Sequence, residues 1–255
     1  MFIAVTVGNH LSASFGCIMC MVTLPDEFLR WNYLPRGKAV LQMVNQRSMR
    51  NMDRFFLEST RHNPALCTAF QREDGQMFVN AKIVGIGYVV KERYISEAMK
   101  VFAEHLRYGD ELFEKARAPA ETKKGSSEFQ KRCALLLIEH LCFEDLRIAR
   151  EHIDFGRMST IELALSHPGS SKHTWQIVQH NLNACLLFYQ PPSISFEVHG
   201  KIEIHEKDAC SKFVNLVHDS FHYSPTRTER PVYIFHVEEV YDNGPSSSQF
   251  GKRIV

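Results

Sequence analysis

The feature that most constrains this sequence is a regular alternation of apolar and polar residues over positions 194–205. Isoleucine, phenylalanine and valine alternate there with serine, glutamate, histidine and lysine, interrupted only at Gly200. A period of two is typical of a β-strand with one buried face. A short apolar run at 184–189 precedes it, and Pro191-Pro192 lies between the two runs, where no β-ladder can continue. The stretch therefore predicts a β-hairpin.

A phosphate-binding helix start is predicted directly before this hairpin, in residues 170–181. The first turn of this segment carries hydroxyls, one ammonium and an aromatic ring, on Ser170, Ser171, Lys172, Thr174 and Trp175. Backbone N–H groups, hydroxyls and a cation at a helix start can together hold a phosphate. The alternative is that these are ordinary solvated residues at a helix end, with the tryptophan packed in the core.

Composition and charge narrow the class of protein. The chain has 255 residues, of which 44% are hydrophobic and 23% charged, a balance typical of globular proteins. Thirty basic and twenty-nine acidic residues give a net charge of +1, which creates no field to attract nucleic acid or an anionic membrane. No apolar run approaches the roughly 20 residues of a membrane span, and the first residues lack the basic start of a signal peptide. We therefore expect a cytoplasmic location, with neither nucleic acid nor a membrane as partner.

The seven cysteines are odd in number and scattered, which favours reduced thiols over a disulfide framework. Two of them, Cys17 and Cys20, form a CxxC pair within residues 2–22, a segment that predicts two strands. A zinc site would need a second pair of ligands, and a redox pair would need a helix start to lower the thiol pKa. Neither is visible, so we interpret both as small core residues.

An internal repeat is a second organising feature. Several residues in the first half have an identical residue 118 positions later, namely His62, Asn63, Cys67, Phe70 and Phe78. Each set is embedded in a basic helix, a short buried strand, a turn, a long strand and a further helix, which predicts a duplicated α+β domain. In the first copy, Arg47, Ser48, Arg50 and Arg54 take the place of the phosphate-binding group. A chance likeness between two strand-and-helix units is the alternative.

The domain boundaries follow from the repeat. The polar stretch APAETKKGSSE, residues 118–128, predicts a linker between a first domain at 1–117 and a second at 129–255. Residues 134–150 are compatible with a helix or with strands. The other expected elements are strands at 38–44, 159–166 and 230–241 and helices at 95–106 and 208–222.

Four segments carry a resemblance to a known family. SSKHTWQIVQHNLNACLLFY, SFEVHGKIEIHE and RPVYIFHVEEVY resemble the pyridoxamine 5'-phosphate oxidase-like, FMN-binding split-barrel superfamily, and FIAVTVGNHLSASFGCIM is similar to its opening hairpin. The chain departs from the family pattern at Asn181, which lies further from Lys172 than is usual and is not followed by proline.

The resemblance implies an α+β fold of two antiparallel split β-barrel domains in tandem, with flanking helices and with FMN bound between barrels. It implies cofactor-binding roles for Ser170, Ser171, Lys172, Thr174 and Trp175, and for Arg47, Ser48 and Arg54 in the first copy. It further implies an FMN-dependent oxidoreductase of a small molecule, with a nicotinamide hydride donor as one candidate partner. Such a protein would act as a homodimer or as an intramolecular pseudo-dimer. Neither a catalytic residue nor a metal ligand is assigned.

The thirteen histidines support an alternative from another class. His218 and His222 are four residues apart on an expected helix, a spacing that places both on one face and within reach of one metal ion. His199, His205 and His236 lie on expected strands. Because the split-barrel family also includes haem-handling proteins, the alternative is a non-catalytic haem- or metal-binding module. A third possibility is a structural or regulatory protein without a ligand.

Overall fold

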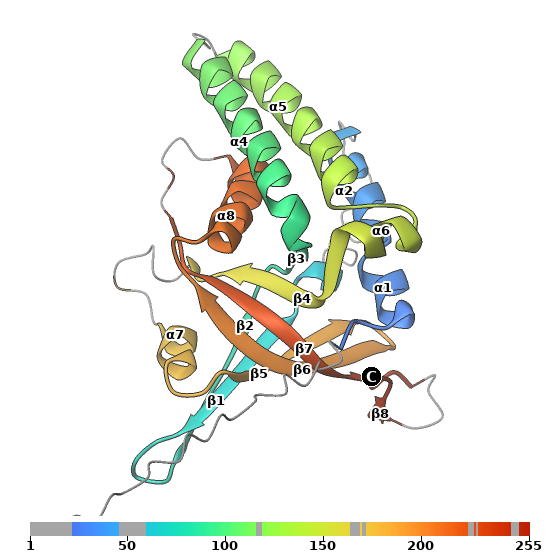
Figure 1. Cartoon of the computed structure of the whole chain (residues 1–255), viewed down its shortest axis with the longest axis vertical. Coiled ribbons are helices and arrows are strands. Elements are labelled where there is room, and N and C mark those ends of the chain that lie inside the picture. Colours follow the sequence, from blue (N-terminus) through green and yellow to red (C-terminus); the bar gives the residue numbers. More distant parts are fainter. Residues whose placement is uncertain are drawn as a thin grey trace, which may run out of the picture.

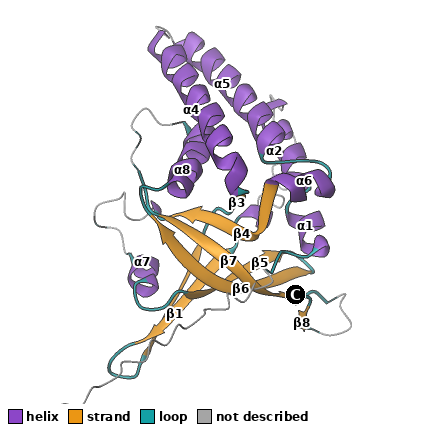
Figure 2. Cartoon of the chain, viewed as in Figure 1, coloured by secondary structure: helices purple, strands orange, loops and turns teal. Residues whose placement is uncertain are grey.

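A computed structural model describes residues 22–45, 60–115, 119–163, 169, 172–223, 227, 229–245 and 250–255. These residues form one antiparallel sheet in the order β2-β1-β5-β6-β7-β4-β3, with β8 paired to β7 (Figure 2). The strands are β1(Ala65–Gln71), β2(Met77–Ile83), β3(Gly87–Val90), β4(Ile153–Ile161), β5(Asn183–Gln190), β6(Ile194–His205), β7(Val232–Asp242) and β8(Lys252–Arg253).

Helices cover the sheet unevenly. Two long helices, α4 and α5, lie side by side and project away from the sheet, while the short α7 lies apart from the other helices (Figure 1) and packs against β1 and β2. None of the described helices is both long and apolar enough to cross a membrane. The helices are α1(Asp26–Asn32), α2(Pro35–Asn45), η1(Thr60–His62), α4(Glu92–Lys115), α5(Pro119–His140), α6(Leu146–His152), α7(His173–Val178) and α8(Ala209–His222).

Aromatic side chains build the core where α1 meets the sheet. The Phe28 ring lies edge-on to Phe188 and Phe196, with ring centroids 5.0 and 5.4 Å apart. Phe28 and Phe188 are fully buried. Such edge-to-face pairs add to the hydrophobic gain of burial. Two of the repeated phenylalanines therefore anchor the β5–β6 hairpin to the helical layer.

The predicted hairpin and several other elements are confirmed. The alternating stretch is β6 and the apolar run before it is β5, joined at Pro191-Pro192. The segment expected at 230–241 is β7, and its first residues are buried on both faces. The helix expected at 95–106 lies within α4, and the helix expected at 208–222 is α8, with Asp208 as its N-cap. The segment 134–150, for which the sequence allowed either a helix or strands, contributes to the helices α5 and α6.

The expectation of two split-barrel domains in tandem is not confirmed, because the described strands from both halves of the chain share one sheet that is not a closed barrel. β1 pairs with β5, and β3 pairs with β4. Among the described residues, the first half contributes only three strands, too few to close a barrel and hide their edges. Pairing with the second half covers one edge of β1 and one edge of β3, and β2 and β3 form the two ends of the described sheet. What remains of the expectation is a mixed α+β fold with an antiparallel sheet.

The offset of 118 positions is visible in the strand registers. Phe70 pairs with Phe78 in the β1–β2 hairpin, and their counterparts Phe188 and Phe196 pair in the β5–β6 hairpin. Cys67 and its counterpart Cys185 lie opposite each other where β1 meets β5. The two hairpins are therefore related by an approximate two-fold axis near these cysteines. Duplication of a whole domain is not confirmed.

Two further expectations fail locally. The segment expected to be a linker begins α5, because its alanine, glutamate and lysine residues favour a helix and proline is tolerated in the first turn. The strand expected at 38–44 lies in α2, which packs along α5, so tertiary packing overrides the β-propensity of its valines. The strand expected at 159–166 begins earlier, as β4. The division into domains at 1–117 and 129–255 stays a prediction.

Several predicted features fall outside the described residues. These are the strands expected at 2–22 with Cys17 and Cys20, the residues Ser170 and Ser171, and the first-copy group Arg47, Ser48 and Arg54.

Candidate functional site

Lys172 lies at the start of α7. It is the residue before the first helical position, its side chain is half-buried, and it does not cap the helix. The side chain makes no hydrogen bond or ion pair among the residues that the structure describes. A lysine held at a helix start without a carboxylate partner has its charge available to an anion.

Thr174 fixes α7 to the sheet. Its side chain is buried, and its Oγ1 accepts a hydrogen bond from Asn80 Nδ2 of β2 at 2.8 Å. The hydroxyl predicted as a phosphate ligand is thus engaged in holding α7 against β2.

Trp175 covers a buried polar cluster. Its ring stacks on Tyr233 of β7, with centroids 6.4 Å apart and planes inclined by 22°. The Tyr233 hydroxyl donates to Glu162 Oε2 at 2.8 Å, and Lys82 Nζ lies 2.8 and 2.9 Å from the two carboxylate oxygens of Glu162. Burial and the adjacent Glu162 raise the pKa of Tyr233, so the phenol remains a hydrogen-bond donor. Sequence reasoning missed this cluster because its members come from four separate segments.

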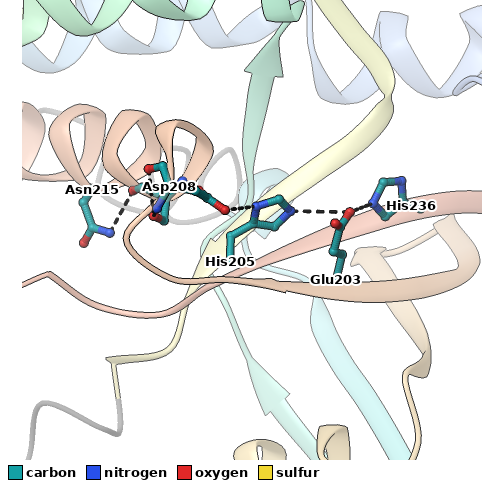
Figure 3. A network of polar contacts seen from close by, with 6 residues as sticks. Glu203, His205, Asp208, Asn215 and His236 are labelled. Carbon is teal, nitrogen blue, oxygen red and sulfur yellow. Dashed lines mark hydrogen bonds and ion pairs between the residues drawn. The ribbon is translucent and has the colours of Figure 1, made fainter.

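A chain of alternating acids and imidazoles runs from α8 into the sheet (Figure 3). Asp208 accepts a hydrogen bond from the backbone N–H of Ser211 and so caps α8, and its other oxygen lies 2.6 Å from His205 Nδ1. His205 Nε2 is 3.4 Å from Glu203 Oε2, which lies 2.7 Å from His236 Nε2.

The same contacts lower the pKa values of the two acids, Glu203 and Asp208. Burial raises the pKa of Glu203, but contacts with His236 and His205 outweigh burial and lower it overall. For Asp208, hydrogen bonds from Ser211 and His205 likewise outweigh burial and lower the pKa. Both acids are therefore ionised at neutral pH. His205 and His236 are successive members of this series of polar contacts. Within the described part of the molecule they do not converge on a common metal site.

His218 and His222 share a face of α8, as their spacing predicts, and their rings lie 4.7 Å apart. His218 Nδ1 is 3.0 Å from Asp219 Oδ1, an acid that also pairs with Arg230. Burial and the charge of His218 lower the pKa of His222. Among the described residues no third donor joins this pair to form a metal site.

One set of three donors does converge in the described part of the chain. It consists of Cys185, Glu197 and His199, whose donor atoms all lie within 4.8 Å of one another. Sequence reasoning treated His199 and Cys185 separately and overlooked Glu197. The signal was present in the hairpin, because Cys185 and His199 lie opposite each other in the β5–β6 register.

A cavity lies away from α7, among residues of β3, α4, α5 and α6. It has a volume of about 240 Å³. Two of its walls are rings in contact, since Tyr94 stacks on His152 with centroids 4.6 Å apart. The lining residues are Val90, Tyr94, Glu97, Ala98, Glu139, His140, Phe143 and His152.

No protein-family model and no curated protein matches this sequence. Among solved structures, the chain is similar to a crystal structure from Listeria innocua that is provisionally described as a pyridoxamine 5'-phosphate oxidase. The two chains are 10% identical, and the match covers 75% of this chain and 98% of the other, with a TM-score of 0.37. A likeness at this level establishes neither a shared fold nor a shared activity.

Proposed function

We propose that this chain binds FMN through Lys172 and acts as a flavin-dependent oxidoreductase of a small molecule. The observation that carries the proposal is the half-buried Lys172 side chain at the start of α7, which has no polar partner among the described residues. It lies within the segment whose sequence resembles the phosphate-binding segment of the split-barrel superfamily. The Listeria innocua structure adds no argument, because the likeness is too low.

The residues around Lys172 fit a phosphate ester in part. The ammonium supplies a charge-assisted hydrogen bond, the strongest single contact available to a phosphate here. The Thr174 hydroxyl is engaged with Asn80, so we assign it the role of holding α7 in place. Ser170 and Ser171 precede Lys172 in the sequence, and their predicted roles as phosphate ligands are part of the proposal.

The contacts of α7 explain how the lysine would be positioned. Asn80 holds the helix from β2, and Tyr233 supports it through the Trp175 ring. These two anchors restrain the helix start, which reduces the entropy lost when a ligand binds. The flavin, once bound, would supply the hydride chemistry itself. The protein's task is then to hold the cofactor and admit the substrate, with a nicotinamide as the candidate hydride donor.

A comparison of FMN with riboflavin tests the proposal, because riboflavin lacks only the phosphate. We expect Lys172→Met to weaken FMN binding by roughly 10- to 100-fold, the equivalent of one charge-assisted hydrogen bond, and to leave riboflavin binding unchanged. Quenching of flavin fluorescence during titration measures both affinities.

The matched control is Lys212→Met, which removes an exposed lysine from α8. It should leave both affinities unchanged. Failure of the wild-type chain to bind FMN would contradict the proposal, as would equal effects of the two substitutions.

A further inference from the structure

The outward face of the central strands carries potential metal ligands in register. Cys185 of β5 lies opposite His199 of β6, and Glu197 is two positions from His199 on the same strand. Residues directly opposite each other on an antiparallel pair, and residues two apart along a strand, project from the same face of the sheet. The hairpin therefore presents a thiol, an imidazole and a carboxylate together. All three side chains are half-buried.

The donor atoms are already close. Those of Cys185, Glu197 and His199 lie within 4.8 Å of one another, and His199 Nε2 is 3.0 Å from Glu197 Oε2. Ligand bonds of 2.0 to 2.3 Å in tetrahedral geometry require donor atoms about 3.3 to 3.8 Å apart. To reach that geometry, donor pairs as far apart as 4.8 Å would have to approach by about 1 Å, and the His199–Glu197 pair, at 3.0 Å, would have to separate slightly.

A second layer of contacts orients two of the ligands. Asn243 Nδ2 donates to Glu197 Oε1 at 2.7 Å, which leaves Oε2 directed at His199. The Tyr241 ring lies edge-on to the His199 ring, with centroids 5.4 Å apart. Outer partners of this kind hold metal ligands in their binding orientation and contribute to affinity.

We propose that Cys185, Glu197 and His199 bind a divalent metal ion of the Zn²⁺ class, with the fourth coordination position open to solvent. A thiolate excludes Mg²⁺ and Ca²⁺, which require oxygen ligands, and a mixture of sulfur, nitrogen and oxygen suits Zn²⁺. On binding, the Cys185 thiol releases its proton to solvent, and each ligand donates one lone pair to the ion. No electron is transferred. The site is independent of the proposed FMN function, because none of the three residues lies on α7.

Two nearby features serve as matched controls. Cys67 lies opposite Cys185 on β1, but its sulfur is not part of the converging set. His236 and Glu203 form a histidine–glutamate pair in the same sheet, with Nε2 and Oε2 2.7 Å apart, and they belong to no converging set of three donors within the described part of the chain.

Titration of the full chain with Co²⁺, with the thiols kept reduced, tests the proposal. We expect one bound ion, the visible bands of four-coordinate Co²⁺, a near-ultraviolet thiolate-to-cobalt band, and displacement of Co²⁺ by Zn²⁺. Cys185→Ser should remove the thiolate band, and His199→Ala and Glu197→Gln should each weaken binding at least 10-fold. Asn243→Ala should weaken it by roughly 10-fold, as the loss of an outer partner does.

Cys67→Ser and His236→Ala should keep the thiolate band and change the affinity by less than threefold. Absence of that band from the reduced wild-type chain would overturn the proposal without reference to any variant. Loss of the band in Cys67→Ser, or an effect of His236→Ala as large as that of His199→Ala, would overturn the assignment of ligands.

Discussion

At the scale of single residues, the acid Glu162 is buried beside the sheet and paired with Lys82. Its side chain is 1% exposed, whereas that of Lys82 is 30% exposed. Lys82 Nζ and the Tyr233 hydroxyl both donate hydrogen bonds to this carboxylate. Removal of Lys82 takes the cation away from a buried ion pair, which costs more than the intact pair contributes.

Lys82→Met should therefore destabilise the fold by about 3 to 5 kcal/mol, and Tyr233→Phe by about 1 to 3 kcal/mol. The double variant Lys82→Met, Glu162→Gln should cost less than the sum of the single changes, because both charges of the ion pair are removed together. Urea unfolding curves measure these free energies. An effect of Lys82→Met no larger than that of Lys212→Met would contradict the account.

His105 makes stability depend on pH. The side chain is fully buried, and its ring stacks on Phe129 with centroids 4.1 Å apart. Burial, reinforced by the charge of Arg132, lowers the pKa of His105 to about 4. The unfolded chain, with a pKa near 6.5, therefore binds the proton more tightly than the folded chain. The contribution of neutral His105 is complete above about pH 6.5 and is lost as the pH falls toward 4.

We accordingly expect the free energy of unfolding to fall by roughly 3 kcal/mol between pH 6.5 and pH 4 on account of this residue. His105→Leu should remove most of that slope. The control His180→Leu, at an exposed histidine, should keep it. Denaturant unfolding at a series of pH values measures the slope, and an unchanged slope in His105→Leu would contradict the assignment.

At the scale of elements, the packing of α4 against its neighbours depends on the close approach of two aromatic rings to Gly109. A Cβ atom added at Gly109 of α4 would lie 2.9 Å from Phe129 Cδ2 and 3.0 Å from Tyr223 Cε2. Tyr223 is held in place by its hydroxyl, which donates to Asp110 Oδ1 at 3.0 Å. At Gly125 of α5, the added atom would meet only the Leu112 side chain, at 3.3 Å or more.

Gly109→Ala should destabilise the protein by about 1 to 3 kcal/mol, because overpacking against two aromatic rings exceeds the gain in helix propensity. Gly125→Ala should be neutral or stabilising by up to about 1 kcal/mol, because a flexible leucine can yield. Thermal unfolding compares the two variants. A stabilised Gly109→Ala variant would show that α4, α5 and α8 are less closely packed than the structure indicates.

The elements that could be predicted from sequence are those whose local pattern and tertiary environment agree. The alternation in β6 matches a strand with one covered face, and the apolar periodicity of α4 matches a helix lying on a core. α2 was misread as a strand because its valines favour strands locally, and only contact with α5 decides otherwise. The polar start of α5 has the composition of a linker, yet it packs as half of a helical pair.

The candidate sites were harder to predict from the sequence, because they too depend on tertiary contacts and not on a local pattern. The repeat marked Cys185, and the histidine count marked His199, but their convergence with Glu197 depends on the register of β5 against β6. Glu162 carries no distinguishing local pattern. Its importance arises from burial, which depends on where Lys82 and Tyr233 arrive in the folded chain.

At the scale of the whole molecule, the shared sheet links the stability of the two halves. β1 pairs with β5 and β3 pairs with β4, so the described strands of the two halves belong to one sheet. We expect a single cooperative unfolding transition, and we expect a fragment of residues 129–255 to be less stable than the intact chain because β4 and β5 would each present an open edge. Calorimetry of the chain and circular dichroism of the fragment measure this. Two separate transitions would instead support independent domains at 1–117 and 129–255.

The most direct test of the central claim is a visible absorbance spectrum of the purified chain after incubation with FMN and removal of free ligand. The account predicts that the two broad bands of oxidised flavin remain with the wild-type protein and are lost in Lys172→Met but not in Lys212→Met. A wild-type spectrum without flavin bands would contradict the assignment of an FMN site to Lys172, and a sharp, intense band of the haem type would favour the haem-binding alternative.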